Sequence, residues 1–500
     1  MFRSSPSRRA LWLLGATVFL ATCLVAQPAT GWNVNSRLDL VFSVVDQGRV
    51  TIDTFHDRKP FTTGDEALYN GHYYSDKTFG VSVIAMPVYG LISGVSRVLH
   101  VHPSFQLIQF LLTRWAVALP AALAAMLLAN LLIRLGAIPR LAVLVTSGVF
   151  FGSMLFGYST VFYPYVPGVA CCLGALTLVW QVPITARRMA LAGLLLGSAL
   201  VFDLTFNISV AVIVVLAILA LRHERRMRAA KLLASSAAAA MVPIGAFAIY
   251  SAHIFGSPTI PYKYEASDYF REGMSRGVMG VTSPKLDVMW FLSFHPYRGI
   301  LFWSPWMVMV VLCGVWLARH DERLRAVAIA SIVTFVAYFL FNAGYYEWWG
   351  GSTMGPRLMI PMFAVVPLTL VAACRADTPV WMRAGLTSTM AAGVALSLPL
   401  SMTEPQTKPG NSIDVLSSVR AGQHLNVPQL DVLRNFYQLN WLGSKHIWLF
   451  PVEISFALCM MVVFGGTALA YLVAAEHDGL NFDDQPTSGL PAHALTSMTN

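Results

Sequence analysis

The sequence of 500 residues predicts an all-α polytopic membrane protein, with about twelve transmembrane helices and a large first extracytoplasmic loop that contains juxtamembrane helices. Its mean hydropathy of +0.60 and its 56% of hydrophobic residues exceed those of an ordinary soluble domain. Many apolar runs reach the ~20 residues that crossing a bilayer of ~30 Å requires. Charged residues make up only 12% of the chain, and the segment 33–80 holds six aspartates and a glutamate.

The first expected span lies in residues 1–28, which we interpret as an N-terminal signal anchor. Arg3, Arg8 and Arg9 precede an apolar run, and because the rest of the chain is polytopic, an uncleaved span is favoured over a cleaved signal peptide. The helical transmembrane domain is expected over 105–474. Its spans are 105–133, 141–158, 166–182, 189–203, 205–221, 231–254, 299–318, 326–343, 358–375, 384–403 and 447–474.

Short basic links connect most of these spans, among them 222–231 (RHERRMRAAK) and 319–325 (RHDERLR). The positive-inside rule assigns such links to the cytoplasm. They share one side of the membrane only if the run 79–99 does not cross, so we expect that run to lie along the outer interface. Both termini are then cytoplasmic, and the polar tail 475–500 is expected to be disordered. The net charge of +9 therefore serves topology and indicates no nucleic-acid partner.

The outer face receives the first external loop, 29–104, and the later external loops 255–298, 344–357 and 404–446. No soluble domain of ordinary size lies between the apolar runs. We therefore expect an active site at the outer membrane surface, with the acidic first loop as its candidate catalytic region.

Carboxylates crowd the first loop, and Asp39, Asp53, Asp65 and Asp76 are the candidate catalytic residues. Apolar residues at helical spacing predict an amphipathic helix that ends at Gly48, with Asp39 on its polar flank. A carboxylate is the group that accepts the proton of an attacking hydroxyl. The sequence leaves open which of the four does so.

Three cations are expected at the same membrane depth and are the candidate phosphate ligands. Lys77 stands at the start of an apolar helix, where backbone N–H groups and the helix dipole favour anions. Arg298 and Arg357 each directly precede a span. Together the three side chains are suited to clamp a lipid phosphate or pyrophosphate and to stabilise it as a leaving group. Taken singly, each also fits an interfacial anchor.

Several other kinds of chemistry lack a sequence signal. All six cysteines lie within or beside apolar runs, so we expect neither a disulfide framework nor a zinc site. No Walker loop, dinucleotide-binding fingerprint, HExxH or GxSxG motif occurs. No cofactor is expected. A divalent metal is compatible with the chemistry, but the sequence does not indicate one.

These motifs and their order resemble those of the GT-C superfamily of membrane glycosyltransferases, among them the protein O-mannosyltransferases and the lipid A aminoarabinose transferases. Their first external loop ends in an element similar to the stretch from Tyr74 to Gly80 (YSDKTFG), and blocks similar to Arg298-Gly299 and Gly355-Pro356-Arg357 follow later. The resemblance implies donor binding by Tyr74 and Lys77, and an orienting role for Asp76.

The sequence departs from this pattern at one place. In many members of the superfamily an acidic pair just after the first span supplies the catalytic aspartate, whereas Asn33, Val34 and Asn35 occupy that place here. An amide does not act as a base, so retained chemistry requires another carboxylate. Asp53 and Asp65 are then the leading candidates, and loss of activity is the alternative.

The resemblance implies an integral-membrane glycosyltransferase that moves a sugar from a polyprenyl-phosphate donor to a glycan, lipid or protein acceptor in the cell envelope. Its expected location is the outer face of a bacterial plasma membrane, with membrane lipid as a further partner. The alternatives are a non-enzymatic lipid or solute transporter or flippase, and an envelope polysaccharide polymerase or ligase. A transporter predicts functional charges at mid-membrane depth, whereas the charges here lie in outer loops.

Overall fold

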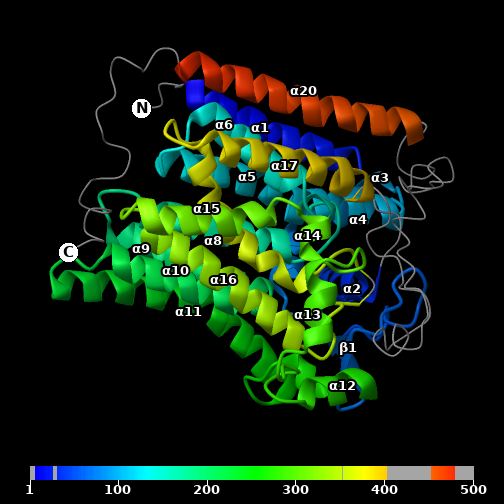
Figure 1. Ribbon diagram of the computed structural model, residues 1–500. Helices are drawn as coiled ribbons and strands as arrows, with labels where there is room; N and C mark the ends of the chain where they lie inside the picture. Colours follow the sequence, from blue (N-terminus) through cyan, green and yellow to red (C-terminus); the bar gives the residue numbers. More distant parts are fainter. Residues whose placement is uncertain (1–5, 26–30, 352, 402–451, 479–500) are drawn as a thin grey trace.

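The chain is an all-α polytopic membrane protein, as expected. The computed structural model describes residues 6–25, 31–351, 353–401 and 452–478. The predicted loop 404–446 lies outside the described residues, as does nearly all of the predicted tail 475–500. Long helices run side by side through most of the molecule, and the short elements gather at one end of this bundle (Figure 1).

The first half of the chain supplies the first external loop and half of the bundle. Helices α4 and α5 are joined by one π-helical turn and form a single long helix. The elements are α1 (Pro6–Cys23), α2 (Trp32–Gln47), β1 (Glu66–Tyr69), β2 (His72–Ser75), α3 (Gly80–Leu99), α4 (Phe105–Thr113), η1 (Arg114–Ala118), α5 (Leu119–Arg134), α6 (Pro139–Phe151), α7 (Leu155–Tyr158), α8 (Tyr165–Val179), α9 (Ala186–Phe202), η2 (Leu204–Phe206), α10 (Asn207–Ala220) and α11 (Arg226–Phe255).

The second half completes the bundle and adds short helices over its loop end. Its elements are η3 (Pro261–Tyr264), α12 (Asp268–Ser275), α13 (Leu286–Ser293), α14 (Ile300–Trp303), α15 (Met307–His320), α16 (Arg325–Gly344), η4 (Arg357–Ala364), η5 (Val366–Cys374), α17 (Val380–Ser401) and α20 (Val452–Asp478).

Six of the described helices are long and apolar enough to cross a membrane, and seven if η4 and η5 form one bent span. Four shorter apolar helices coincide with further predicted spans. The span predicted over 358–375 is broken, because η4 and η5 are 3₁₀ helices that meet at 54°. Pro361 and Pro367 remove backbone donors there and favour such a break. The predicted total of about twelve spans stays a prediction.

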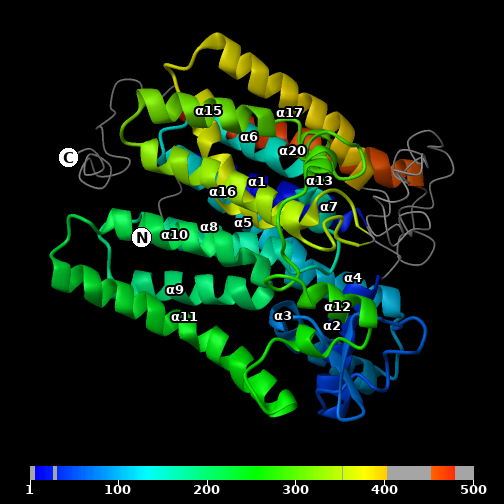
Figure 2. The same ribbon diagram turned by 60° about the horizontal axis from the view of Figure 1, so that its bottom comes forward.

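Small residues allow a close helix contact between α9 and α11. A Cβ atom on Gly193 would lie 1.9 Å from the carbonyl oxygen of Ser236, and one on Gly197 would lie 2.3 Å from that of Ala240. Only glycine permits backbones to approach this closely, as is common between membrane helices. Figure 2 shows the two helices lying along each other at the edge of the bundle.

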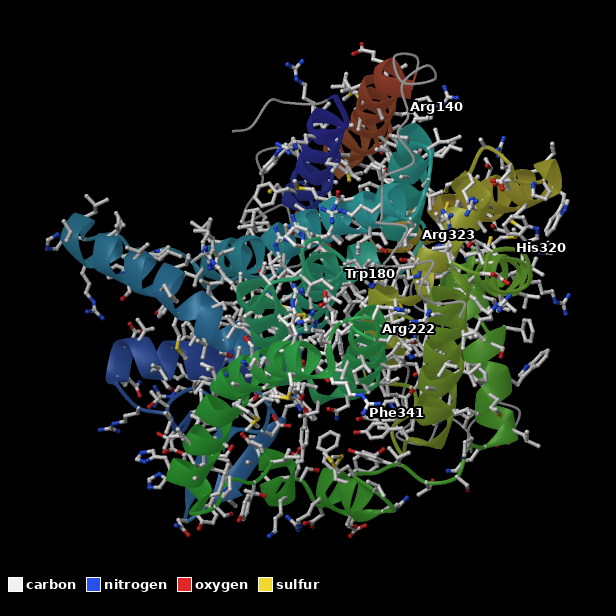
Figure 3. The ribbon with its side chains drawn as sticks, turned by 90° about the vertical axis from the view of Figure 1, so that its left-hand side faces the viewer. Arg140, Trp180, Arg222, His320, Arg323 and Phe341 are labelled. Atoms are coloured by element: carbon white, nitrogen blue, oxygen red, sulfur yellow. The ribbon has the colours of Figure 1, made fainter. Side chains whose placement is uncertain are left out.

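The two ends of the bundle differ in character. Helices α2, α12 and α13 gather with the β hairpin at one end (Figures 1 and 2). Figure 3 views the molecule from the opposite end, where Arg140, Arg222 and Arg323 of the basic links lie. The basic links and the external loops are therefore at opposite ends, as the charge pattern predicts.

The predicted amphipathic helix of the first loop is present as α2, which ends at Gly48 in the left-handed conformation (φ 64°). Its partner is α3, which runs beside it in the same direction. The Ser82 hydroxyl donates to the carbonyl oxygen of Arg37 (2.9 Å), and the Tyr89 hydroxyl donates to Asp46 (2.6 Å). Although α3 has the length and composition of a span, it packs along α2. Its expected place outside the bilayer stays a prediction.

Candidate active site

The β hairpin of the first loop delivers Asp76 and Lys77 to the interior of the protein. The hairpin turns through Asn70 and Gly71, both with positive φ, as a tight two-residue hairpin turn requires. Beyond β2, the Thr78 hydroxyl donates to the carbonyl oxygen of Phe202 at the end of α9 (2.7 Å). Gly80 then packs so closely that a Cβ atom would lie 2.7 Å from the carbonyl oxygen of Val201. The segment between β2 and α3 is thereby docked onto the bundle.

Lys77 is the centre of a buried charge cluster. Its ammonium nitrogen lies 3.1 Å from Oδ2 of Asp65 and also bonds Asp76. The ring of Tyr262 lies 5.7 Å away. Burial alone would lower the pKa of Lys77, but Asp65 and Asp76 raise it well above its usual range, so the ammonium stays charged. Among the residues the structure describes, no group of three His, Cys, Asp or Glu side chains is placed to hold a metal ion.

Glu265 adds a third carboxylate to this cluster from the loop after α11. An isolated β-bridge joins Glu265 to Ala67, and the Ala266 N–H donates to the carbonyl oxygen of Glu66 (2.9 Å). Burial, together with the nearby Asp76 charge, raises the pKa of Glu265 to about 11. Glu265 is therefore protonated at neutral pH, which avoids a third buried negative charge beside one ammonium.

Helix α2 fixes the position of Asp76. The Ser36 hydroxyl lies 2.8 Å from the Ser75 hydroxyl and donates to Oδ1 of Asp76 (3.3 Å). All three side chains are buried. Asp76 is thus held between Ser36 and Lys77, consistent with the orienting role that the resemblance implies.

Arg298 uses its guanidinium to hold the loop after α16. Nε donates to the carbonyl oxygen of Trp349 (2.5 Å), and the two terminal nitrogens donate to those of Gly351 (2.8 Å) and Tyr297 (2.9 Å). Burial lowers the pKa of this arginine. All three of its nitrogens donate to backbone carbonyls, so Arg298 positions this loop, and its predicted phosphate contact stays a prediction.

Of the three candidate phosphate ligands, Arg357 has the fewest partners among the described residues. Its NH1 nitrogen lies 3.4 Å from the Tyr163 hydroxyl, and its buried Nε has no hydrogen-bond partner. In the described part of the chain no carboxylate lies within ion-pair distance of it. Gly350, with φ of +70°, covers the side chain so closely that a Cβ atom would lie 2.8 Å from Cγ of Arg357. The guanidinium thus keeps donors free for an anion.

Glu347 interacts electrostatically with Arg357 and with two residues of the Lys77 cluster, Lys77 and Asp65. Burial raises the pKa of Glu347 to about 7, and Arg357 and Lys77 oppose that rise while Asp65 adds to it. The later loop and the first loop therefore contribute charges to one region. The expectation that Lys77 and Arg357 share a phosphate site stays a prediction.

Two predicted acids do not join that region in the expected way. Asp53 accepts hydrogen bonds from His72 (2.8 Å) and from the Tyr73 N–H (2.7 Å), and it does not pair with Lys77. Asp39 was expected on a polar flank, but it is fully buried, and neither of its oxygens has a partner among the described residues. Burial raises its pKa to about 9. Asp39 is therefore protonated at neutral pH, because the hairpin and α3 cover the face that sequence periodicity assigns to solvent.

Tyr74 lies in an apolar cluster, and its expected role as a donor ligand stays a prediction. It packs with Ala67, Ile254 and Phe255 in a small apolar cluster. Its ring centroid lies 5.8 Å from that of Phe255. Tyr74 therefore joins the hairpin to the end of α11.

The asparagines at the place of the superfamily's acidic pair serve the first loop. Nδ2 of Asn35 donates to the carbonyl oxygens of Pro60 (3.0 Å) and Thr62 (2.8 Å). Arg37 donates to the side-chain oxygen of Asn33. A carboxylate at position 35 has no proton to donate at neutral pH, so the amide here is a structural requirement.

Sequence analysis missed Glu265, Glu347 and Tyr262 as site residues. Glu347 is the single acidic residue of the aromatic-rich loop 344–357, and this contrast is a signal for it in the sequence. Glu265 stands in a loop that also holds Asp268, Glu272 and Asp287, so no local pattern sets it apart.

Comparisons with known proteins give structural matches only. No family model and no curated protein matches the chain. ArnT from Cupriavidus metallidurans bound to undecaprenyl phosphate is similar with a TM-score of 0.49 and 14% identity, over 98% of this chain and 77% of that one. The archaeal oligosaccharyltransferase AglB from Archaeoglobus fulgidus, in complex with an inhibitory peptide and a dolichol-phosphate, is similar with a TM-score of 0.48 and 11% identity.

The match to AglB covers 89% of this chain but 61% of AglB, so this chain spans less than two thirds of its length. Both similar proteins are GT-C glycosyltransferases, the superfamily that the sequence motifs resemble. Neither the identities nor the TM-scores extend that likeness to activity.

Proposed function

We propose that this protein is a glycosyltransferase that moves a sugar from a polyprenyl-phosphate donor to a cell-envelope acceptor at the outer face of a bacterial plasma membrane. The observation that carries the proposal is the placement of Arg357. It is a half-buried cation whose buried Nε has no hydrogen-bond partner and which has no carboxylate partner in the described structure, and it acts on Glu347 together with Lys77 and Asp65.

Arg357 is suited to the phosphate of the donor. When the bond between the sugar and the phosphate breaks, negative charge develops on the phosphate oxygens, and a half-buried guanidinium fixed beside them stabilises that charge more strongly than water does. The donor carries its own activated bond, so the proposal includes no nucleotide. The Lys77 ammonium is already bound by the carboxylates of Asp65 and Asp76, so we do not assign it a phosphate contact equal to that of Arg357. We propose that Lys77 holds these two carboxylates in place.

The carboxylates beside Lys77 are suited to position the acceptor. Asp65 is partly exposed, with 14% of its side-chain surface accessible, whereas Asp76 has 1%. Asp65 is therefore the member that an acceptor hydroxyl reaches. Both remain proposed site residues.

Two separate observations support the polyprenyl-phosphate class of lipid and the external location of the site. ArnT was solved with undecaprenyl phosphate and AglB with dolichol-phosphate, and the same class of lipid matches an anion-binding arginine at the loop end of an apolar bundle. The basic links lie at the opposite end, which supports an external site and cytoplasmic termini.

The proposal is tested with purified protein reconstituted in lipid vesicles and a panel of radiolabelled undecaprenyl-phosphate sugars. We expect the wild type to release undecaprenyl phosphate from one of them in the presence of an envelope extract. Movement of the intact lipid-linked sugar across vesicles, with no release, would instead establish the transporter alternative.

A further inference from the structure

The loop that carries Glu347 is held in one conformation from several sides. The Tyr346 N–H donates to the carbonyl oxygen of Gly280 (2.8 Å), and an isolated β-bridge joins Tyr345 to Val281. Further along, Arg298 binds the carbonyl oxygens of Trp349 and Gly351, as described above. A side chain between such fixed points is preorganised, as a reacting group must be.

The Glu347 carboxylate itself is left without a bound partner. It takes part in no hydrogen bond or ion pair within the part of the chain that the structure describes. Gly351 lies against it, since a Cβ atom there would be 3.4 Å from Oε1 of Glu347 and 3.9 Å from a terminal nitrogen of Arg357. The carboxylate and the free guanidinium therefore flank the same glycine.

The other acids of the region are either bound to Lys77 or protonated. Asp65 and Asp76 both bind the Lys77 ammonium. Glu265 and Asp39 are protonated at neutral pH, for the reasons given above. Among these acids, Glu347 is the one with a free carboxylate beside the candidate phosphate ligand.

We propose that Glu347 is the general base of the transfer reaction, in place of the acid that Asn33 and Asn35 lack. This inference rests on the proposed function. The acceptor hydroxyl oxygen forms a bond to the anomeric carbon of the sugar, and the bond from that carbon to the phosphate oxygen breaks. The electron pair of the broken bond stays on the phosphate, where Arg357 stabilises it. The hydroxyl proton passes to the Glu347 carboxylate.

The protonation behaviour of Glu347 suits this role. Its pKa of about 7, raised chiefly by burial, lies where a base combines availability with proton affinity. The charged and titratable groups that act on it are Arg357, Asp65, Lys77 and Arg298. Because the base must be ionised, the transfer rate rises with pH through about 7.

The test compares wild type, Glu347→Gln, Glu347→Asp and Glu347→Ala, with Glu272→Gln as the control because Glu272 is an exposed glutamate of helix α12. We expect Glu347→Gln to lower the transfer rate at least ~10²-fold, the usual contribution of a general base. Binding of undecaprenyl phosphate is expected to change less than ~2-fold, since the phosphate ligand Arg357 is intact. Glu347→Asp is expected to retain part of the rate with a shifted pH profile.

Azide supplies a second readout, because this anion attacks the anomeric carbon without losing a proton. We expect azide to restore sugar release in Glu347→Ala, with a glycosyl azide as the product. Wild-type rates in Glu347→Gln, or a lack of azide rescue in a Glu347→Ala protein that still binds undecaprenyl phosphate, would overturn the assignment of the base alone. A wild type that transfers no sugar would overturn the proposed function, and the base assignment with it.

Discussion

The ammonium of Lys77 lies 3.1 Å from the carboxylate of Asp65, although the two residues are separated by the whole β hairpin. This ion pair joins the two ends of the β hairpin in the first loop. With Asp76 on the same ammonium, the cluster holds one cation between two acids in a buried setting. Such an arrangement is stable only while it is complete.

Replacing Lys77 by methionine leaves two buried carboxylates without their cation. We expect the free energy of unfolding to fall by about 3–5 kcal/mol, the usual cost of breaking a buried pair. The measurement is thermal unfolding of the purified protein in detergent. Lys285→Met is the control, because Lys285 is exposed. Adding Asp65→Asn and Asp76→Asn to Lys77→Met is expected to recover part of the loss. Equal midpoints for the two single variants would contradict this account of the cluster.

Substitution by lysine is expected to affect stability at Arg298 and lipid binding at Arg357. Arg298→Lys loses the fork that binds Trp349 and Gly351, so its midpoint of thermal unfolding should fall. Arg357→Lys loses no carboxylate partner among the described residues, so its main effect should be weaker binding of undecaprenyl phosphate. Parallel unfolding and lipid-binding measurements on the two variants check this separation. The reverse pattern would show that Arg298 is the lipid ligand.

Gly350 and Gly71 offer a matched pair of substitutions by alanine. Both have positive φ, so both variants carry the same kind of backbone strain, of roughly 1–2 kcal/mol. Only at Gly350 does the added methyl group meet Arg357, whereas it meets nothing within 4 Å at Gly71. We expect both variants to lose stability and only Gly350→Ala to lose lipid binding. Equal binding in the two variants would separate Gly350 from the anion site.

Restoring an acid at position 35 is expected to damage the first loop and not to improve activity. Asn35→Asp loses the donors to Pro60 and Thr62 and sets a carboxylate against two carbonyl oxygens, at a cost of about 1–3 kcal/mol. Asn33→Asp keeps the acceptor that Arg37 uses and should be nearly neutral. Thermal unfolding and the transfer rate are the measurements. A more active Asn35→Asp protein would mean that the missing acid limits the reaction.

Protonated Glu265 makes stability depend on pH. Its folded pKa of about 11 lies above the ordinary value of 4.5. The unfolded chain therefore releases this proton near pH 4.5 while the folded chain keeps it, and the contribution to stability is complete below that pH and lost as pH rises towards 11. Glu265→Gln should flatten this decline in unfolding midpoints measured from pH 5 to 10. Glu272→Gln is the control. If the unfolding midpoint of Glu265→Gln declined with pH as steeply as that of the wild type and of the control, the pH dependence would belong to other groups.

Local features of the site were predictable and distant ones were not. Lys77 and Asp76 are neighbours at the start of an apolar helix, and this position singles them out in the sequence, although their ion pair was not predicted. Glu265 and Glu347 are far along the chain from Asp65 and Lys77 but interact with them in the fold. A local sequence pattern does not indicate such interactions between distant segments. Asp39 was placed on the wrong flank because periodicity describes one covered face, whereas α2 is buried on all sides from Val34 to Ser43.

The most direct test of the account is the rate at which undecaprenyl phosphate is released from a labelled lipid-linked sugar in a single turnover. The wild type and Arg97→Ala, whose arginine is 70% exposed on α3, are expected to release it at the same rate. Arg357→Ala is expected to be slower by about 10²-fold or more, as for loss of a group that stabilises a leaving anion. An Arg357→Ala protein that binds the donor and releases the lipid phosphate at the wild-type rate would contradict the central claim.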